Sequence, residues 1–292
     1  MNDRLSLLSV VEQLSPSVTV RRLGDLRVLV VDHPRVRGAV TLQGGQVIAW
    51  QPAGSAPDGL WLGERNTWRA GEPVWGGVPL CWPWFGRAGE PLHGFARVLD
   101  WDLVTLDESA DGVALTLSLS SSGRTLRTWP HDFALSTRIV LGTTCGIEVA
   151  AHGEYTSTAA LHTFLSIGSL GRARLSGLGG RYADNLLSTN VGGSDGMVTP
   201  TGHIERIYTD PERACVVEDT ARGRAVGIAH HGASDVVVWN PGPELSASTS
   251  QLTDADYRRF LCVETGRINT PLTSTPDRPG RLGVTLRLLP DA

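Results

Sequence analysis

Residues Leu115 to Ser120 read Leu-Thr-Leu-Ser-Leu-Ser, so an apolar side chain alternates with a hydroxyl-bearing one along the stretch. Because successive side chains of a β-strand point to opposite faces, this alternation predicts a strand with one buried and one solvated face. Val284 to Leu288, which reads Val-Thr-Leu-Arg-Leu, repeats the pattern near the C-terminus. Half-buried strands of this kind are typical of antiparallel sheets, so the two stretches predict an antiparallel all-β protein.

The rest of the chain carries the same signal in shorter form. Runs rich in β-branched and aromatic residues occupy 28–31, 36–42, 47–50, 138–141, 236–239 and 260–263. Turns are supplied by 34 glycines and 17 prolines. Only Leu5 to Leu14 has the apolar spacing of a helix, and residues 183–202 are expected to form a long surface loop. We therefore expect residues 1–292 to form a single domain, a large antiparallel β-sandwich of two packed sheets with few short helices.

Charge and composition exclude several classes of function. The chain has 26 basic and 30 acidic residues, a net charge of −4, so binding of nucleic acid is not expected. Every basic residue is an arginine, which excludes lysine Schiff-base chemistry and a P-loop lysine. The four cysteines form no Cys-x-x-Cys pair, which favours a reduced, cytoplasmic protein. We find no export signal and no apolar run near the ~20 residues of a membrane span, so no membrane association is expected.

Tryptophans are concentrated in one part of the chain. Six of the nine lie between positions 50 and 84, where their rings can line a pocket or stack on the C–H face of a sugar. Core packing is the alternative, and it is favoured for Trp50, Trp61 and Trp68. Trp82 and Trp84 differ, because they lie in the run Gly76 to Gly86, whose two prolines do not fit a regular central strand. We therefore expect Trp82 and Trp84 on a rigid aromatic loop beside a cleft.

A polar segment follows this loop. His93-Gly94-Phe95-Ala96-Arg97 places an imidazole and a guanidinium four residues apart. Histidine can donate a proton near neutral pH, and the planar guanidinium suits an anionic or hydroxyl-rich ligand. A turn-stabilising histidine and a structural ion pair are the alternatives.

Six motifs stand in a fixed order along the chain. They are Gly76 to Gly86, His93 to Arg97, Trp129-Pro130-His131-Asp132-Phe133, Leu161-His162-Thr163-Phe164, Val238-Trp239-Asn240-Pro241-Gly242-Pro243 and Cys262-Val263-Glu264. In sequence and order they resemble the motifs of the hexose-6-phosphate mutarotases of the aldose 1-epimerase superfamily. The resemblance covers about 18–290 and includes Asp32-His33-Pro34 and Leu42-Gln43-Gly44, so it spans nearly the whole chain.

The resemblance implies a large β-sandwich with the sugar site on the concave face of a sheet. It also implies a cofactor-free enzyme, and we expect a monomer. By motif, His162 is the catalytic acid and Glu264 the catalytic base. Glu205 corresponds to the family's sugar-binding acid, Arg97 is expected to face the phosphate of the substrate, and His93 to orient the sugar or polarise its ring oxygen.

The reaction requires such an acid and base on chemical grounds alone. Interconverting the α and β anomers removes the proton of the anomeric hydroxyl and protonates the ring oxygen, so that the ring opens and closes on the other face. His162 and Glu264 are 102 residues apart, and only the folded sheets can bring them together. Taken singly, His162 also fits a hydrogen-bonded core histidine and Glu264 a buried ion-pair partner.

One position departs from the family pattern. The family places an arginine directly before the Gly-Gly of the first motif, whereas this chain has Trp75. Loss of that charge-assisted contact weakens phosphate recognition by ~1.5 to 3 kcal/mol, unless Arg69, Arg87 or Arg127 replaces it. Trp75 and Trp82 are both expected to contact the sugar.

The sequence therefore predicts interconversion of the anomers of a hexose 6-phosphate by a glutamate and a histidine. A mutarotase of unphosphorylated hexoses is the near alternative, and a noncatalytic carbohydrate-binding protein on the same fold is another. The partner in each case is a small-molecule sugar or sugar phosphate. A metal-dependent enzyme ranks last, because the eight histidines show no ligand spacing, and adjacent His230 and His231 would point to opposite faces of a strand. No metal is expected.

Overall fold

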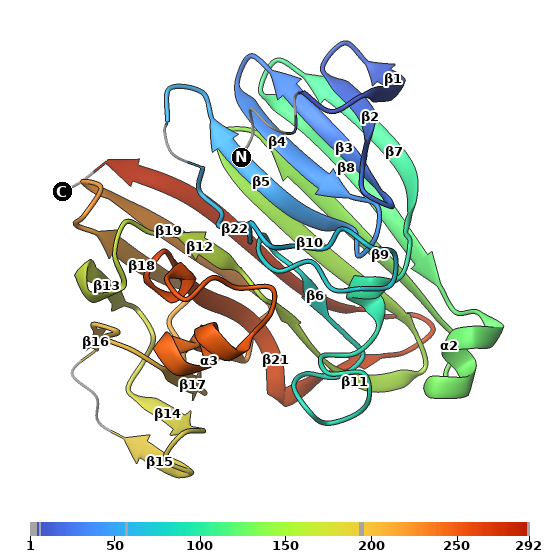
Figure 1. Cartoon of the computed structure of the whole chain (residues 1–292). Helices are drawn as coiled ribbons and strands as arrows, with labels where there is room; N and C mark the ends of the chain where they lie inside the picture. Colours follow the sequence, from blue (N-terminus) through green and yellow to red (C-terminus); the bar gives the residue numbers. More distant parts are fainter. Residues whose placement is uncertain (1–4, 6, 56–57, 193–195, 291–292) are drawn as a thin grey trace.

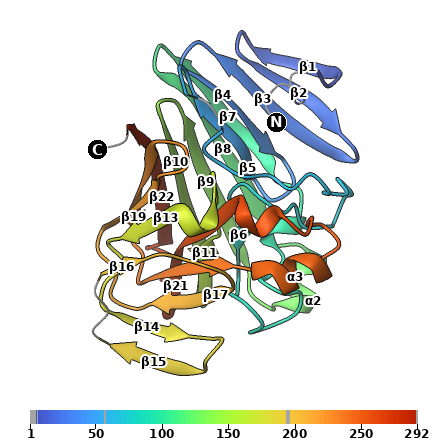
Figure 2. The same cartoon turned by 60° about the vertical axis from the view of Figure 1, so that its left-hand side comes forward.

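Three antiparallel sheets make up the computed structural model, which describes residues 5, 7–55, 58–192 and 196–290 (Figures 1 and 2). The five-stranded sheet is a meander of β1 (Val10–Ser15), β2 (Val18–Leu23), β3 (Leu26–His33), β4 (Val36–Thr41) and β5 (Gln46–Pro52). The nine-stranded sheet has the order β16 (Met197–Val198), β13 (Ala173–Ser176), β18 (Ala214–Asp219), β19 (Arg224–His231), β22 (Gly280–Pro290), β10 (Thr144–Gly153), β9 (Phe133–Leu141), β8 (Gly112–Ser120) and β7 (Asp102–Ser109).

The eight-stranded sheet carries residues of four of the six sequence motifs. Its order is β15 (Thr189–Gly192), β14 (Arg181–Asp184), β17 (Ile204–Tyr208), β20 (Asp235–Asn240), β21 (Phe260–Ser274), β11 (Tyr155–Leu161) and β6 (Leu80–Cys81), and β12 (Phe164–Ser166) also pairs with β21. The long strand β21 therefore pairs with both β11 and β12, which follow one another along the chain.

The nine-stranded sheet is the layer that the other two sheets cover (Figures 1 and 2). At its β7 to β10 end it faces the five-stranded sheet, where Leu141 of β9 fills the space beside Gly38 of β4. Further along, β21 and β11 of the eight-stranded sheet lie against β22. One continuous apolar core runs through all three sheets. This continuity supports our proposal that the chain is a single domain.

The alternating burial along the strands confirms the all-β prediction. Leu115 and Leu117 of β8 are fully buried, whereas Thr116 and Ser118 between them are partly exposed. The expected pair of sheets is instead a set of three, because β1 to β5 close into a meander of their own that covers only one end of the nine-stranded sheet.

Two local expectations are wrong. From Val10 onward the expected helix is strand β1, since β-branched Val10 and Val11 favour extended backbone and the segment pairs with β2. The expected loop at 183–202 begins inside β14, which forms a hairpin with β15, and also includes the short strand β16; residues 193–195 lie outside the described residues.

Helices are few and short in the part of the chain that the structure describes. They are α2 (Gly123–Thr128) and α3 (Gly242–Ser248), with single 3-10 turns at Ala96–Val98, Leu170–Arg172 and Asp256–Arg258. A capping box between Ser122 and Thr125 begins α2. No described helix is both long and apolar enough to cross a membrane. All four cysteines are buried and free.

Candidate active site

Strand pairing brings His162 and Glu264 together. Leu161 at the end of β11 pairs with Thr265 of β21, and Phe164 at the start of β12 pairs with Cys262. His162 lies in the short connection between β11 and β12, opposite the intervening residues of β21. Its Nε2 atom is 3.4 Å from Oε1 of Glu264.

Both members of this pair are buried. His162 is 7% exposed and Glu264 is 1% exposed. Burial lowers the pKa of His162 well below its ordinary value, and the positive charge of Arg97 lowers it further. Burial raises the pKa of Glu264 well above its ordinary value, and the negative charge of Glu205 adds to the rise. Both shifts favour the uncharged forms, neutral His162 and protonated Glu264. When one proton moves from Glu264 to His162, the resulting carboxylate is a stronger base and the resulting imidazolium a stronger acid than the free side chains.

Each member of the pair also has an atom with unused bonding capacity. The Nδ1 atom of His162 and the Oε2 atom of Glu264 are buried and have no hydrogen-bond partner among the described residues. The imidazole stacks on Phe164, with ring centroids 4.6 Å apart and planes 10° apart, and meets Trp239 edge-on at 5.8 Å. Buried polar atoms are rarely left unpaired, so the two atoms are candidates for ligand contact.

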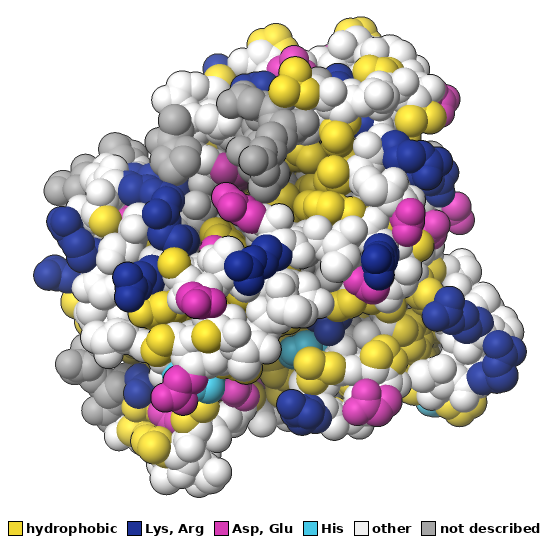
Figure 3. Space-filling view, viewed as in Figure 1, with side chains coloured by type: hydrophobic (Ala, Val, Ile, Leu, Met, Phe, Trp, Pro, Cys, Tyr) yellow, Lys and Arg dark blue, Asp and Glu magenta, His cyan; other side chains and the backbone are white. Residues whose placement is uncertain are grey.

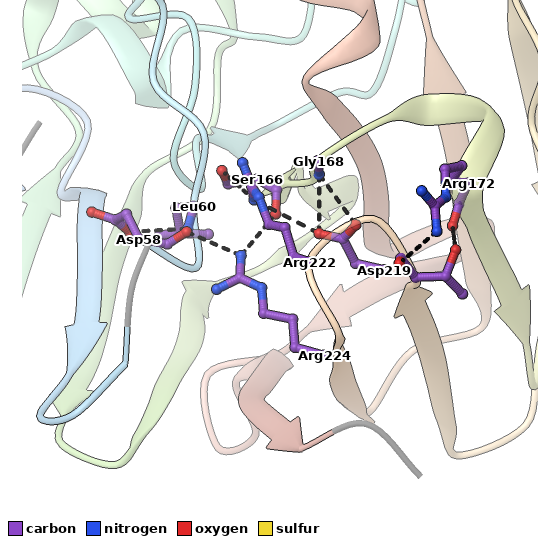
Figure 4. A network of polar contacts seen from close by, with 9 residues as sticks. Asp58, Leu60, Ser166, Gly168, Arg172, Asp219, Arg222 and Arg224 are labelled. Carbon is purple, nitrogen blue, oxygen red and sulfur yellow. Dashed lines mark hydrogen bonds and ion pairs between the residues drawn. The ribbon is translucent and has the colours of Figure 1, made fainter.

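The far end of β12 is anchored by two arginines (Figure 4). Arg222 donates from Nη1 to the hydroxyl of Ser166 at 3.0 Å, and Arg224 donates from Nη2 to the Ser166 carbonyl at 3.0 Å. Arg224 also reaches the carbonyl of Asp58 at 3.3 Å, and Asp219 accepts from the Gly168 backbone. These contacts fix the strand that directly follows the His162 connection.

His93 lies beside the pair, with its ring centroid 5.7 Å from that of His162. Its φ of 64° is unusual for a residue other than glycine, and such strain is concentrated at functional sites. The backbone N–H of Gly86 donates to Nδ1 at 3.2 Å, so the proton of the neutral ring must be on Nε2. Burial and the charge of Arg97 lower the pKa of His93 to about 3, so the ring is a neutral hydrogen-bond donor.

Arg97 lies close enough to Glu264, His162 and His93 for its charge to act on them. Its Nη2 donates to the Leu92 carbonyl at 2.8 Å, and its Nε is buried without a partner in the described part of the chain. Its charge lowers the pKa of Glu264, His162 and His93. Figure 3 shows a hollow in this face of the molecule with a histidine and a basic side chain inside it.

Glu205 reaches the site from the other side of β20. It pairs with Trp239, which in turn pairs with Cys262 of β21, so Glu205 and Trp239 share a face of the sheet. Asn185 donates from its side-chain amide to Oε1 of Glu205 at 2.9 Å. Sequence reasoning missed Asn185 altogether, because nothing in its surroundings marks it. It missed the role of Trp239, although that residue stands inside the Val238 to Pro243 motif.

The two expected tryptophans differ in position. Trp75 is partly exposed and packs against the cluster that contains Phe164 and Phe260. Trp82 is fully buried, and its indole N–H donates to the hydroxyl of Ser157 at 3.1 Å. With no exposed surface, Trp82 supports the site from behind rather than lining it.

The three arginines considered as substitutes at the phosphate site differ in their surroundings. Arg69 is within 4.0 Å of Glu72, and Arg127 donates to the Gly123 carbonyl of its own helix. Arg87 is exposed on the loop after Trp84.

His230 and His231 point to opposite faces of β19, as the strand geometry predicts. Nδ1 of His230 is 2.8 Å from the hydroxyl of Thr265 in the eight-stranded sheet. Nε2 of His231 is 2.9 Å from the hydroxyl of Thr285 in its own sheet. Among the described residues, no three His, Cys, Asp or Glu side chains cluster as metal ligands.

Known proteins resemble this chain along its whole length. The family model described as aldose 1-epimerase matches residues 27–282. A Salmonella typhimurium protein named "Putative glucose-6-phosphate 1-epimerase" is 41% identical over 290 residues, which are 98% of each chain. An Escherichia coli K12 protein of the same name is 41% identical over 293 residues, 99% of each chain.

Solved structures agree with this similarity. The crystal structure of a "putative mutarotase" from Salmonella typhimurium has a TM-score of 0.97 at 40% identity, over 99% of both chains. A galactose mutarotase-like protein from Lactobacillus casei has a TM-score of 0.70 at 12% identity, over 89% of this chain and 99% of its own, and shows likeness of fold alone.

Proposed function

Since the chain belongs to the aldose 1-epimerase family, a family of isomerases, we propose that it interconverts the α and β anomers of a hexose 6-phosphate. The observation that carries this proposal is the buried pair of His162 and Glu264, 3.4 Å apart, each with an unpartnered polar atom. An acid and a base held this close can act on the two oxygens bonded to one anomeric carbon.

In the proposed mechanism, the Glu264 carboxylate accepts the proton of the anomeric hydroxyl while protonated His162 donates to the ring oxygen. The bond between C1 and the ring oxygen breaks, and C1 becomes an aldehyde. After rotation about the C1–C2 bond, ring closure returns one proton to His162 and takes the other from Glu264. Both groups regain their starting states, so the cycle needs no external proton source.

The surrounding residues are proposed to hold the sugar. Neutral His93 donates from Nε2 to a sugar oxygen, and Glu205, held by Asn185, accepts from a hydroxyl. Arg97 is proposed to contact the phosphate, and the partly exposed ring of Trp75 to contact the sugar.

A mutarotase of unphosphorylated hexoses is the second candidate. The position of Trp75 favours it, because an aromatic ring packed on the Phe164 cluster supplies an apolar wall and no charge for a phosphate dianion.

One experiment separates the candidates. NMR exchange between the anomers of glucose and of glucose 6-phosphate is measured with and without the protein. Faster exchange of glucose 6-phosphate supports the proposal, and acceleration of glucose alone supports the second candidate. Binding of either sugar without faster exchange would leave a carbohydrate-binding protein and reject both enzymes.

A further inference from the structure

A second hollow lies beside strand β11 of the eight-stranded sheet. It is a shallow, open hollow of about 440 Å³ between the loop after β6, the end of α2, strand β11 and Pro271 of β21. Thr158 of β11 lines the hollow. It precedes His162 by four residues, a separation of roughly 13 Å at about 3.3 Å per residue of extended strand. In Figure 3 it is the depression lined by hydrophobic side chains beside α2.

Two indole rings line this hollow and are fixed without a ligand. Trp84 and Trp129 are both partly exposed. Trp84 donates its N–H to the Pro91 carbonyl at 2.8 Å, and Gly89 packs on its ring so closely that a Cβ there would be 2.8 Å from it. Trp129 packs edge-on against Trp82 at 4.9 Å. The rings are therefore a preformed apolar surface.

Polar groups with free capacity surround the rings. Thr128, Thr156 and Glu90 line the hollow, and their side chains make no hydrogen bond or ion pair to the described residues. The hydroxyls of Ser157 and Thr158 accept from the Trp82 indole and the Phe85 backbone, so each O–H can still donate. A few convergent polar groups on an apolar surface are the ordinary composition of a small-molecule site.

This lining fits one ligand chemistry better than others. A neutral sugar offers apolar C–H faces for indole rings and hydroxyls that both donate and accept. Among the described residues that line the hollow, Glu90 is the one with a charged side chain, and it repels a phosphate. The volume falls within the about 300 to 1,000 Å³ typical of small-molecule sites. We propose that the pocket of Trp84 and Trp129 is a second, noncatalytic binding site for a neutral sugar ring.

Saturation-transfer NMR with methyl α-D-glucopyranoside tests this proposal. Its blocked anomeric oxygen prevents ring opening, and excess glucose 6-phosphate competes at the catalytic pair. We expect a signal that persists in the presence of glucose 6-phosphate. Thr156→Phe fills the pocket from an exposed strand position and should abolish that signal, whereas Thr105→Phe, on exposed edge strand β7, should leave it intact.

Further variants and probes decide the remaining outcomes. Trp84→Leu removes a ring without filling the pocket and should also abolish the signal, with thermal unfolding as the check on folding. A signal that survives both pocket variants would overturn the proposal, as would its complete displacement from the wild type by glucose 6-phosphate. Binding of tetramethylammonium in place of the glycoside would identify a cation cage instead. If the glycoside binds at this pocket but the protein does not speed anomer exchange, the proposed function is rejected and the second site is retained.

Discussion

Replacing Arg97 with alanine is expected to raise the KM for glucose 6-phosphate far more than the KM for glucose. The guanidinium has one hydrogen bond to Leu92 and a buried, unpartnered Nε, so it retains capacity for an anion. A charge-assisted hydrogen bond contributes about 1.5 to 3 kcal/mol, which corresponds to about a 10- to 140-fold change in KM. Partial burial favours the upper part of this range, because a buried charge is screened less by salt.

The same substitution changes the pH dependence in a defined direction. Arg97 lowers the pKa of Glu264 and of His162, so its removal lets both groups hold their protons more tightly. Both limbs of the pH–rate profile should therefore move to higher pH. Anomer exchange of both sugars, measured by NMR across the neutral range, reports the KM values and the profile together.

Two control variants separate charge from local packing. Arg138→Ala removes an exposed arginine from β9 of the nine-stranded sheet and should change neither quantity. Arg97→Lys keeps the charge and should retain the pH profile. Equal losses for glucose and glucose 6-phosphate in Arg97→Ala would refute the phosphate role and assign Arg97 to the reacting end of the sugar.

Three further substitutions test other parts of the structure. Trp75→Arg should strengthen binding of glucose 6-phosphate and make it weaken with added salt, because a charge is added to the site; dissociation constants unchanged at two ionic strengths would place Trp75 outside it. Trp82→Ala should lower the free energy of unfolding in urea by about 3 to 5 kcal/mol, since the ring is fully buried, and a loss under about 1 kcal/mol would contradict its core position. Burial raises the pKa of Asp58 to about 6, so the folded chain holds this proton more tightly than the unfolded chain does. The free energy of unfolding should therefore fall by about 3 kcal/mol as the pH rises from about 4 to 6. Asp58→Asn keeps an acceptor for the backbone N–H groups of Trp50 and Leu60 but does not titrate, so its free energy of unfolding should not show this fall. If the wild type and the variant differ in this free energy by the same amount at every pH, the assignment is refuted.

The sequence predicted strands well where one face is buried. Alternation at 115–120 and 284–288 depends only on which side of a sheet each residue faces, and both segments form strands with buried leucines. Alternation carries no information about which strand pairs with which. The separate meander of β1 to β5 was therefore missed, and the edge strand β1 was mistaken for a helix.

The site residues were predicted from sequence motifs and not from the geometry of the fold. The contact of His162 with Glu264 depends on the register of β21 against both β11 and β12, which no local pattern encodes. The burial of Trp82 depends on rings contributed by Phe133 and Tyr155, far along the chain. Asn185 touches Glu205 only because β14 pairs with β17, with Asp184 opposite Arg206.

The most direct test of the catalytic assignment is the anomer exchange rate of the variants His162→Asn and Glu264→Gln. Each substitution removes one proton-transferring group and keeps nearly the same volume. With folding verified by thermal unfolding, we expect each to slow the catalysed exchange of glucose 6-phosphate by ~10² or more, the usual contribution of a positioned acid or base. A folded variant that exchanges the anomers at near the wild-type rate would contradict the assignment of that residue.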